Sequence, residues 1–235
     1  PTAVVIPNQV DEICQVMEFC LLNDVPVVAR GAGTSLSGGA RPDKRGIVLS
    51  LARFNKILEI DRENRFARVQ PGVRNLAISE AVGHLGLYYA PDPSSQIACT
   101  IGGNVAENAG GIHCLKYGLT VHNVLKLDVV LANGARATFG SLALDAPGYD
   151  LLALLHGSEG LLGILVEVTV RLLPRPPTAR AILAAFDDIT QAGDAVGAVI
   201  ASGIVPAGLE MMDNPAIRAA EEFAACGYPV DAASI

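Results

Sequence analysis

Charged residues are scarce in this sequence, since Asp, Glu, Lys and Arg together make up only 17% of its 235 positions. Hydrophobic residues account for 51%, so the chain can bury a sizeable core and lacks the composition of a disordered protein. The net charge of −7, with no basic stripe, argues against a nucleic-acid partner. No apolar run reaches the ~20 residues that a membrane-spanning helix needs.

Metal-binding spacings are also missing. The cysteines lack the Cys-x-x-Cys spacing of zinc ribbons and redox pairs. No two histidines lie at the i, i+4 spacing of a helical ligand pair, so we expect no metal site within this sequence. The sequence begins with Pro1 and ends with Ile235 in an uncharged stretch, and we expect it to be a fragment of a longer protein. The cysteines of the sequence are Cys14, Cys20, Cys99, Cys114 and Cys226, and its histidines are His84, His113, His122 and His156.

The first 56 residues predict the order strand, helix, strand, loop, strand. Apolar runs at residues 3–6, 26–29 and 47–51 have the length of short strands. Between the first two runs, apolar side chains recur at helical spacing over residues 10–21, and Asn8 is the expected N-cap of this helix. The long segment between the second and third runs is expected to be a loop.

The pattern of the following residues, up to residue 177, is dominated by hairpins. Two pairs of apolar segments with short polar connections predict two β-hairpins. The second connection contains Asn133-Gly134, which readily supplies the positive φ angles of a two-residue turn. The expected elements are hairpins at residues 57–61 with 66–70 and 127–131 with 136–139, a helix at 75–85, and a strand at 163–172.

Three prolines, at positions 174, 176 and 177, mark an expected domain boundary. Beyond them the pattern alternates between strand and helix, which is typical of the opening half of an α+β domain. The expected elements are strands at residues 181–186 and 207–211 and helices at residues 189–201 and 215–225.

A glycine-rich loop follows the expected strand at residues 26–29. Residues 31–39 combine four glycines with Thr34, Ser35 and Ser37. Glycines allow positive φ, so successive N–H groups can form an anion nest to which the hydroxyl groups add donors. A plain surface loop is the alternative. The Rossmann fingerprint of nicotinamide-binding proteins does not fit, because Leu36 stands where the last glycine of that motif is required and no helix begins here. A P-loop does not fit either, because the Gly-Lys-Ser/Thr of that motif is absent.

Two further segments are rich in glycine and small polar residues. Residues 90–111 contain Pro-Asp-Pro-Ser-Ser and Thr-Ile-Gly-Gly-Asn, and residues 157–164 read Gly-Ser-Glu-Gly-Leu-Leu-Gly-Ile. Such segments let a flat ring system and its diphosphate lie against the backbone. Together with the first loop, in this order and spacing, they resemble the FAD-binding domain of the vanillyl-alcohol-oxidase-like (PCMH-type) flavoproteins.

The resemblance runs from Pro1 to Ile235. It is most specific at residues 111–123, Gly-Ile-His-Cys-Leu-Lys-Tyr-Gly-Leu-Thr-Val-His-Asn, and at residues 208–214, Gly-Leu-Glu-Met-Met-Asp-Asn. Within the superfamily the sequence is most similar to the FAD-linked D subunits of glycolate oxidases. The resemblance implies an α+β fold with FAD-binding subdomains at residues 1–56 and 57–177 and the beginning of an α+β substrate (cap) domain at residues 178–235.

The resemblance also implies the cofactor contacts. Backbone amides of the first loop would wrap the FAD diphosphate, the second segment would run along the diphosphate and isoalloxazine, and Ile164 would lie near the adenine. Relatives that attach FAD covalently do so at positions that are here Thr34 or Ser35 and Ala98, with Cys99 one residue away, so we expect non-covalent FAD. The expected cofactor-binding residues are Arg30, Gly31, Ala32, Gly33, Thr34, Ser35, Ser37, Pro91, Asp92, Ser94, Thr100, Ile101, Gly103, Asn104, Asn108, Gly110, Glu159, Gly163 and Ile164.

Individual side chains keep alternative interpretations. Arg30 can pair with a phosphate or orient its loop, and Glu159 can accept from a ribose hydroxyl or cap its own turn. Asn108 is favoured over Glu107 as a flavin contact, because a carboxamide both donates and accepts hydrogen bonds. His113 follows the second glycine segment and is a weak candidate for a general base, a role that requires hydrogen-bond reach of the substrate.

The resemblance implies FAD-dependent oxidation of a small 2-hydroxy acid by hydride transfer to flavin, glycolate to glyoxylate or alternatively D-lactate to pyruvate. The family's His-x-Gly-Asp-Gly-Asn-x-His substrate and metal motif does not occur here, so we expect this fragment alone to be inactive. The implied partners are other glycolate oxidase subunits, including an iron–sulfur subunit, in the cytoplasm or peripherally at the inner membrane face. A non-catalytic FAD-binding module and a flavoenzyme with another substrate are open alternatives.

Overall fold

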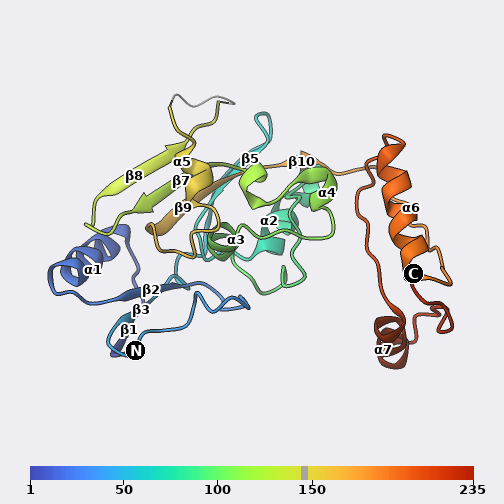
Figure 1. The fold of residues 1–235 in the computed structure, drawn as a ribbon. Coiled ribbons are helices and arrows are strands. Elements are labelled where there is room, and N and C mark those ends of the chain that lie inside the picture. The colour runs from blue at the N-terminus through green and yellow to red at the C-terminus, as the bar shows by residue number, and fades with distance from the viewer. Residues whose placement is uncertain (144–147) are drawn as a thin grey trace. The chain divides into compact units, whose positions relative to one another are not determined.

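The computed structural model describes residues 1–143 and 148–235, which form two compact units, Pro1–Arg175 and Pro176–Ile235 (Figure 1). Helices and strands are mixed along the chain, which confirms the predicted α+β class. The predicted boundaries after residues 56 and 177 stay predictions. Within the described part of the chain, no helix combines the length and the apolarity needed to cross a membrane.

A small parallel sheet opens the first unit. Its strands are β1 (Ala3–Val5), β2 (Val27–Arg30) and β3 (Ile47–Ser50), in the spatial order β1-β3-β2. Because parallel strands need a crossover connection, helix α1 (Val10–Leu22) links β1 to β2. One face of α1 is buried in a hydrophobic cluster shared with β3. The predicted order of strand, helix, strand, loop and strand is confirmed.

The first turn of α1 differs from the prediction. Gln9, not Asn8, occupies the N-cap position, and its side chain makes no capping hydrogen bond. Instead, the carboxylate of Glu12 accepts a 2.6 Å hydrogen bond from the backbone N–H of Asn8. The negative charges of Asp11 and Glu12 also suit the positive end of the helix dipole. An acidic first turn therefore replaces the expected cap.

A five-stranded antiparallel sheet forms the frame of the rest of this unit. Both predicted hairpins are confirmed, but the turn of the second one differs. The N–H of Leu131 donates to the carbonyl of Ala135 at 2.8 Å, which leaves residues 132–134 as the loop, and only Gly134 there has a positive φ, 77°. The strands, in spatial order, are β4 (Ile57–Asp61), β5 (Phe66–Val69), β9 (Ile164–Arg171), β7 (Val124–Val130) and β8 (Arg136–Gly140).

The main hydrophobic core lies between this sheet and two helices. Helix α2 (Asn75–Val82), continued by the 3-10 turn η1 (Gly83–Leu85), matches the predicted helix at residues 75–85. Helix α3 (Ile101–Glu107) contributes buried side chains to the same cluster, as do Leu127 of β7 and Val168 of β9. Alternation along the strands directs one row of side chains at the helices, and burial of that row is the main driving force for folding.

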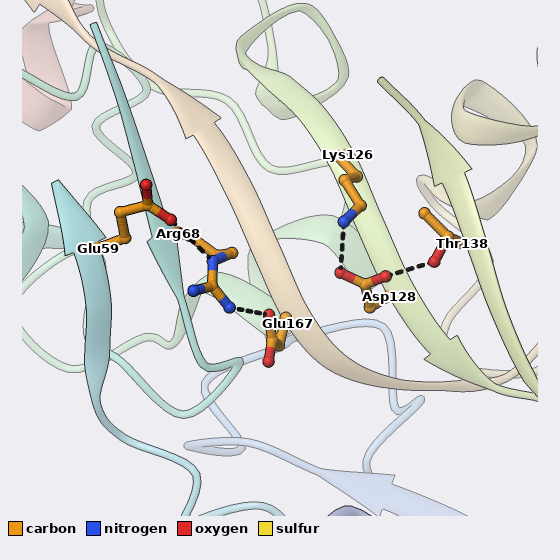
Figure 2. Close-up of polar contacts among 6 residues, drawn as sticks. All are labelled: Glu59, Arg68, Lys126, Asp128, Thr138 and Glu167. Carbon is orange, nitrogen blue, oxygen red and sulfur yellow. Dashed lines mark hydrogen bonds and ion pairs between the residues drawn. The ribbon is translucent and has the colours of Figure 1, made fainter. Parts of the chain in front are cut away.

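The opposite face of the sheet carries a row of polar side chains (Figure 2). Arg68 lies between two carboxylates, 3.2 Å from that of Glu59 and 2.8 Å from that of Glu167. Further along the row, Lys126 Nζ lies 3.2 Å from the carboxylate of Asp128. Half-exposed ion pairs each add little stability. The row nevertheless specifies the register, because a slip by one residue would turn these charges into the core.

Short elements complete the first unit. Each has five residues or fewer, which is too short for a periodic apolar pattern, so the sequence does not predict them. The two shortest are strands that pair with each other in antiparallel fashion. The elements are β6 (Leu87–Tyr88), α4 (Cys114–Tyr117), η2 (Thr120–Asn123), α5 (Leu151–Leu155) and β10 (Leu173–Pro174).

The second unit contains the two predicted helices, α6 (Ile189–Ala201) and α7 (Asn214–Ala224). Each begins after an aspartate whose carboxylate accepts a backbone N–H of the first turn, Asp188 for α6 and Asp213 for α7. Aspartate is among the preferred N-cap residues, because it satisfies one of the free N–H groups at the start of a helix. Local capping therefore fixes where both helices begin.

The two strands predicted in the second unit are wrong. Among the residues that the structure describes, neither 181–186 nor 207–211 belongs to a strand. Ser234 makes single antiparallel bridges with Phe186 and with Asp213 instead. A strand requires a continuous ladder of hydrogen bonds with a neighbour, and an apolar run by itself does not provide that neighbour.

We expect Leu127→Ala to lower the free energy of unfolding by about 2–5 kcal/mol, because a fully buried side chain is lost and a cavity remains. Urea denaturation followed by circular dichroism measures this change. Leu58 on β4 is 36% exposed, so Leu58→Ala is the matched control, with an expected loss of at most about 1 kcal/mol. Equal losses in the two variants would contradict the assignment of the buried face.

Candidate cofactor site

Three segments that lie far apart in the sequence line one cavity of about 160 Å³ in the first unit. They are the loop after β2, the segment that leads into α3, and the loop that leads into β9. These are the three glycine-rich segments of the sequence. The predicted cofactor-binding residues that line the cavity are Arg30, Gly31, Ala32, Gly33, Thr34, Ser35, Thr100, Gly103, Asn104, Glu159 and Gly163.

The loop after β2 presents a run of unused backbone donors. Within residues 1–143 and 148–235, no N–H group from Gly31 to Ser35 has a hydrogen-bond acceptor. Hydrogen bonding resumes at Ser37, whose N–H donates to Ser35 Oγ at 3.2 Å. Backbone donors without a protein partner need water or a ligand, and successive donors form a nest for an anion. This loop can therefore bind a diphosphate.

Two glycines determine the backbone path of the loop after β2. A Cβ atom on Gly31 would overlap Thr100 Oγ1, so only glycine allows the loop to approach the second segment this closely. Gly33 has a φ of 72°, in the left-handed region that other residues rarely adopt. A Cβ atom there would lie 2.5 Å from Nη2 of Arg30, whose guanidinium folds back over its own loop. That position favours the interpretation in which Arg30 orients the loop.

Helix α3 brings a further donor to the cavity wall. Thr100 is its N-cap, since Oγ1 accepts a 3.4 Å hydrogen bond from the N–H of Gly103. One turn later, Asn104 is only 3% exposed, and its Nδ2 has no acceptor among the residues that the structure describes. A buried amide donor that stays unpaired is costly, so Nδ2 of Asn104 is a polar group left unsatisfied beside the cavity.

The donors and the volume together fit one part of a dinucleotide such as FAD. Phosphate oxygens are acceptors, and the loop amides offer donors to this space. The volume of about 160 Å³ is below the ~300–1,000 Å³ of pockets that enclose a whole ligand. The cavity can thus enclose the diphosphate while the remainder of the cofactor extends beyond it.

Two carboxyl groups also line the cavity, those of Glu107 and Glu159. Ser37 Oγ donates a 3.2 Å hydrogen bond to Glu107 Oε2. A hydrogen bond from Glu107 raises the pKa of Glu159, and burial and the charge of Glu107 raise it further. Among the described residues, no three His, Cys, Asp or Glu side chains gather as a metal site requires.

Several predicted residues lie elsewhere, and their contacts with a cofactor stay predictions. Ile101 and Ile164 are buried in the two hydrophobic clusters of the first unit. Asn108 follows α3 in a left-handed conformation, and its Oδ1 accepts a 3.0 Å hydrogen bond from the N–H of Val121. The predicted residues that do not line the cavity are Ser37, Pro91, Asp92, Ser94, Ile101, Asn108, Gly110 and Ile164.

His113 does not line the cavity either. Its Nδ1 lies 2.6 Å from Oδ2 of Asp92, and its backbone N–H donates to Oδ1 of the same carboxylate at 3.3 Å. Gly111 makes room for this pair, since a Cβ atom there would overlap Asp92. The carboxylate therefore orients the imidazole, and the proposed general-base role of His113 stays a prediction.

A few lining residues carry no signal of a binding site in the sequence. Pro71 is one example, because a Cβ atom on Gly102 would lie 2.6 Å from Pro71 Cβ. Its only signal is the Pro-Gly pair after β5, which indicates a turn but not a binding site. Other lining residues lie within the three predicted segments but are not predicted singly, namely Gly39, Pro93, Ser95, Cys99, Gly102, Ala106, Glu107, Ala109 and Gly160, whereas Ala29, Ala40, Leu51 and Leu165 lie outside these segments.

Comparison with known proteins shows the family of this chain. Residues 1–140 match the family model of the FAD binding domain, and residues 175–235 match that of the C-terminal domain of FAD linked oxidases. The chain is 63% identical over 235 residues to the glycolate oxidase subunit GlcD of Escherichia coli K12, covering 100% of this chain and 47% of that protein. It is 47% identical to GlcD of Bacillus subtilis, covering 100% of this chain and 50% of that protein.

A more distant relative carries a different enzyme name. A D-lactate dehydrogenase of Anaerostipes hadrus is 35% identical, with 95% of this chain and 47% of that protein covered. The chain thus spans about half the length of the curated relatives it matches.

Solved structures share the fold. An alkyldihydroxyacetonephosphate synthase aligns with a TM-score of 0.77 at 22% identity, over 94% of this chain and 40% of that one. A Phl p 4 variant described as a glucose oxidase aligns with a TM-score of 0.64 at 23% identity, over 74% of this chain and 35% of that one. At such identities the likeness shows the fold alone. With a family model that matches residues 1–140 and a relative of 63% identity, the chain belongs to the FAD-binding, PCMH-type family of FAD-linked oxidases, as its motifs predict.

Proposed function

We propose that the complete protein oxidises a small 2-hydroxy acid, glycolate to glyoxylate, with FAD as the hydride acceptor. The observation that carries this proposal is the cavity with open amides from Gly31 to Ser35, in a chain 63% identical to a glycolate oxidase subunit. D-lactate is the second candidate substrate, because a relative with 35% identity is named a D-lactate dehydrogenase.

The tasks of this chain in the reaction are binding and orientation. When bound, FAD supplies a flavin ring that can accept the hydride of the substrate α-carbon. The amides from Gly31 to Ser35 would hold the diphosphate and offset its charge. Groups that bind the substrate carboxylate and take up the hydroxyl proton are expected in the cap-domain motif, which this sequence does not contain.

The chemistry of the site favours non-covalent FAD. The positions that correspond to covalent attachment points in some relatives are Thr34 or Ser35 and Ala98, none of which offers an imidazole or thiol. Cys99 lines the cavity but is 4% exposed, and burial raises the pKa of its thiol. A thiol with a raised pKa is a weak nucleophile at neutral pH, so Cys99 is poorly suited to form a flavin linkage.

Partner subunits are part of the proposal. Two relatives are named as subunits of glycolate oxidase, which supports an assembly with other subunits. We propose an iron–sulfur subunit among them as the route for electrons, and a cytoplasmic complex that attaches peripherally to the inner membrane face through its partners. The alternative of a non-catalytic FAD-binding module rests on the absence of the cap-domain motif from this sequence.

Gly31→Val is expected to weaken FAD binding at least about tenfold, because its side chain would overlap Thr100 and close the gap between loop and helix. Fluorescence titration of the full-length apoprotein with FAD measures the Kd. Gly83→Ala is the matched control, since a Cβ atom there meets nothing within 4 Å, and it should bind FAD like the wild type. Unchanged affinity in Gly31→Val would place the diphosphate elsewhere.

The full-length protein, loaded with FAD, is expected to reduce an artificial electron acceptor with glycolate as donor. Residues 1–235 alone are expected to retain FAD absorbance near ~450 nm but to show no turnover, because the substrate motif is missing. Parallel assays with glycolate and D-lactate would rank the two substrates. Turnover of glycolate by residues 1–235 alone would show that this chain contains the substrate-binding groups, and failure of the full-length protein with both acids would refute the proposed function.

A further inference from the structure

A carboxylate–imidazole pair lies directly beside the cofactor cavity. Asp92 Oδ2 is 2.6 Å from Nδ1 of His113, and Asp92 Oδ1 accepts the backbone N–H of His113 at 3.3 Å. Pro93, which follows Asp92 directly, lines the cavity, and so does Ala109, which lies four residues before His113. A ligand that extends out of the cavity past Pro93 and Ala109 can therefore reach this pair.

The backbone on both sides of the pair is held by other contacts. Asn75 Nδ2 donates to the carbonyl of Pro91, directly before Asp92, at 3.0 Å. In the other segment, the N–H and the thiol of Cys114 both donate to the carbonyl of Gly111, at 3.2 Å and 2.8 Å. The contact between carboxylate and imidazole is thus an addition to segments that have their own fixing hydrogen bonds, and its effect is to orient the imidazole.

The free edge of the imidazole is open to a ligand. A Cβ atom on Gly111 would overlap Oδ1 and the carbonyl oxygen of Asp92, so glycine keeps the space in which the carboxylate lies. The side chain of Asp92 is only 17% exposed, whereas that of His113 is 39% exposed. Nε2 of His113 is not buried, and it has no hydrogen-bond partner in the part of the chain that the structure describes. The carboxylate therefore anchors one edge of the ring and leaves the other edge free.

This geometry determines the chemistry of the imidazole. A carboxylate that accepts the Nδ1 proton leaves Nε2 of the neutral ring with a free lone pair. When Nε2 takes up a proton, the same carboxylate stabilises the imidazolium that forms. The pair can therefore gain one positive charge at its accessible edge without a change in its own contacts.

The other titratable groups packed near the imidazole are Cys114, Lys116 and Tyr117 of its own segment and Tyr88 of β6. The ring of Tyr117 lies 6.4 Å from the imidazole, with Lys116 Nζ 5.6 Å from its centroid and the ring of Tyr88 edge-on at 6.2 Å. Burial raises the pKa of Tyr88, so its phenol stays neutral. An imidazole is the group in this set that ordinarily changes charge between pH ~5 and ~8.

We propose that His113, oriented by Asp92, contacts the flavin ring of the bound cofactor and takes up one proton when that ring is reduced. The inference rests on the proposed function, with the FAD diphosphate in the cavity. Of the two parts of FAD that extend beyond the diphosphate, the flavin ring changes charge in the proposed reaction and the adenosine does not. Transfer of a hydride to the neutral ring adds one negative charge, and a solvent proton bound at Nε2 adds the matching positive charge.

The expected consequence is an easier reduction of bound FAD. A cation beside the ring stabilises the reduced, negatively charged form relative to the neutral oxidised form. By linkage, this effect is present where the imidazole carries its proton, and it fades as pH rises and the proton is lost. We expect the protonated imidazole to favour reduced over oxidised FAD about tenfold, which is ~30 mV of midpoint potential for a two-electron couple.

The test is a redox titration of the full-length protein loaded with FAD, followed by flavin absorbance at pH ~6 and pH ~9. His113→Gln is expected to lower the midpoint potential by ~30 mV at pH ~6 and to leave it unchanged at pH ~9. His113→Lys carries a cation at both pH values, so it should keep the wild-type potential at pH ~6 and exceed it at pH ~9. His84→Gln, at an exposed position of η1, is the matched control and keeps the wild-type potential at both.

Asp92→Asn tests the orienting carboxylate. It removes the charge that stabilises the imidazolium, so the potential at pH ~6 should fall towards that of His113→Gln. A wild-type potential in Asp92→Asn, or equal potentials in the wild type and His113→Gln at both pH values, would overturn the inference.

Two further outcomes would also overturn it. Lost turnover in His113→Gln with an unchanged potential would instead favour the general-base role of His113. Failure of His113→Gln to bind oxidised FAD would show that the imidazole holds the cofactor before it is reduced. Failure of the wild-type protein to bind FAD would overturn the proposed function as well, which separates the two tests.

Discussion

The N–H groups between Gly31 and Ser35, which have no acceptor in the described part of the chain, are the constraint on which the rest of this structure depends. A loop that presents its donors to a ligand cannot stabilise itself through internal hydrogen bonds, so its neighbours must hold it open. β2 fixes the start of the loop in the parallel sheet, and Gly31 packs against Thr100 at the start of α3. The site therefore exists only when both sheets of the first unit have formed.

The five-stranded sheet reaches the cavity through α3 and the loop before β9. Ile101 and Val105 of α3 are fully buried in the main core, which fixes the rotation of this helix. The N–H of Gly157 donates to the carbonyl of Val105 at 2.9 Å, so the third segment is attached to the same helix. Burial of apolar side chains by the sheet thus sets the positions of the polar residues of α3 that line the cavity.

The sequence predicts those elements whose pattern is local. Alternation and turn residues suffice for both hairpins, and helical spacing suffices for α1, α2, α6 and α7. The segments 181–186 and 207–211 show the limit, because an apolar run indicates extended backbone but not the partner that a strand requires. The loop at residues 132–134 shows another, since the same Asn-Gly pair fits connections of different length.

The site shows the same division between local and tertiary information. Glycine segments are visible in the sequence because close approach and positive φ are demands on single residues, whereas the wall residue Pro71 acquires its role only through its neighbours. The choice between Glu107 and Asn108 depends on the residue at which α3 ends, which a periodic pattern fixes only to within one or two positions. Glu107, the last residue of α3, lines the cavity and the left-handed Asn108 does not, so the wall carries an acid at this point.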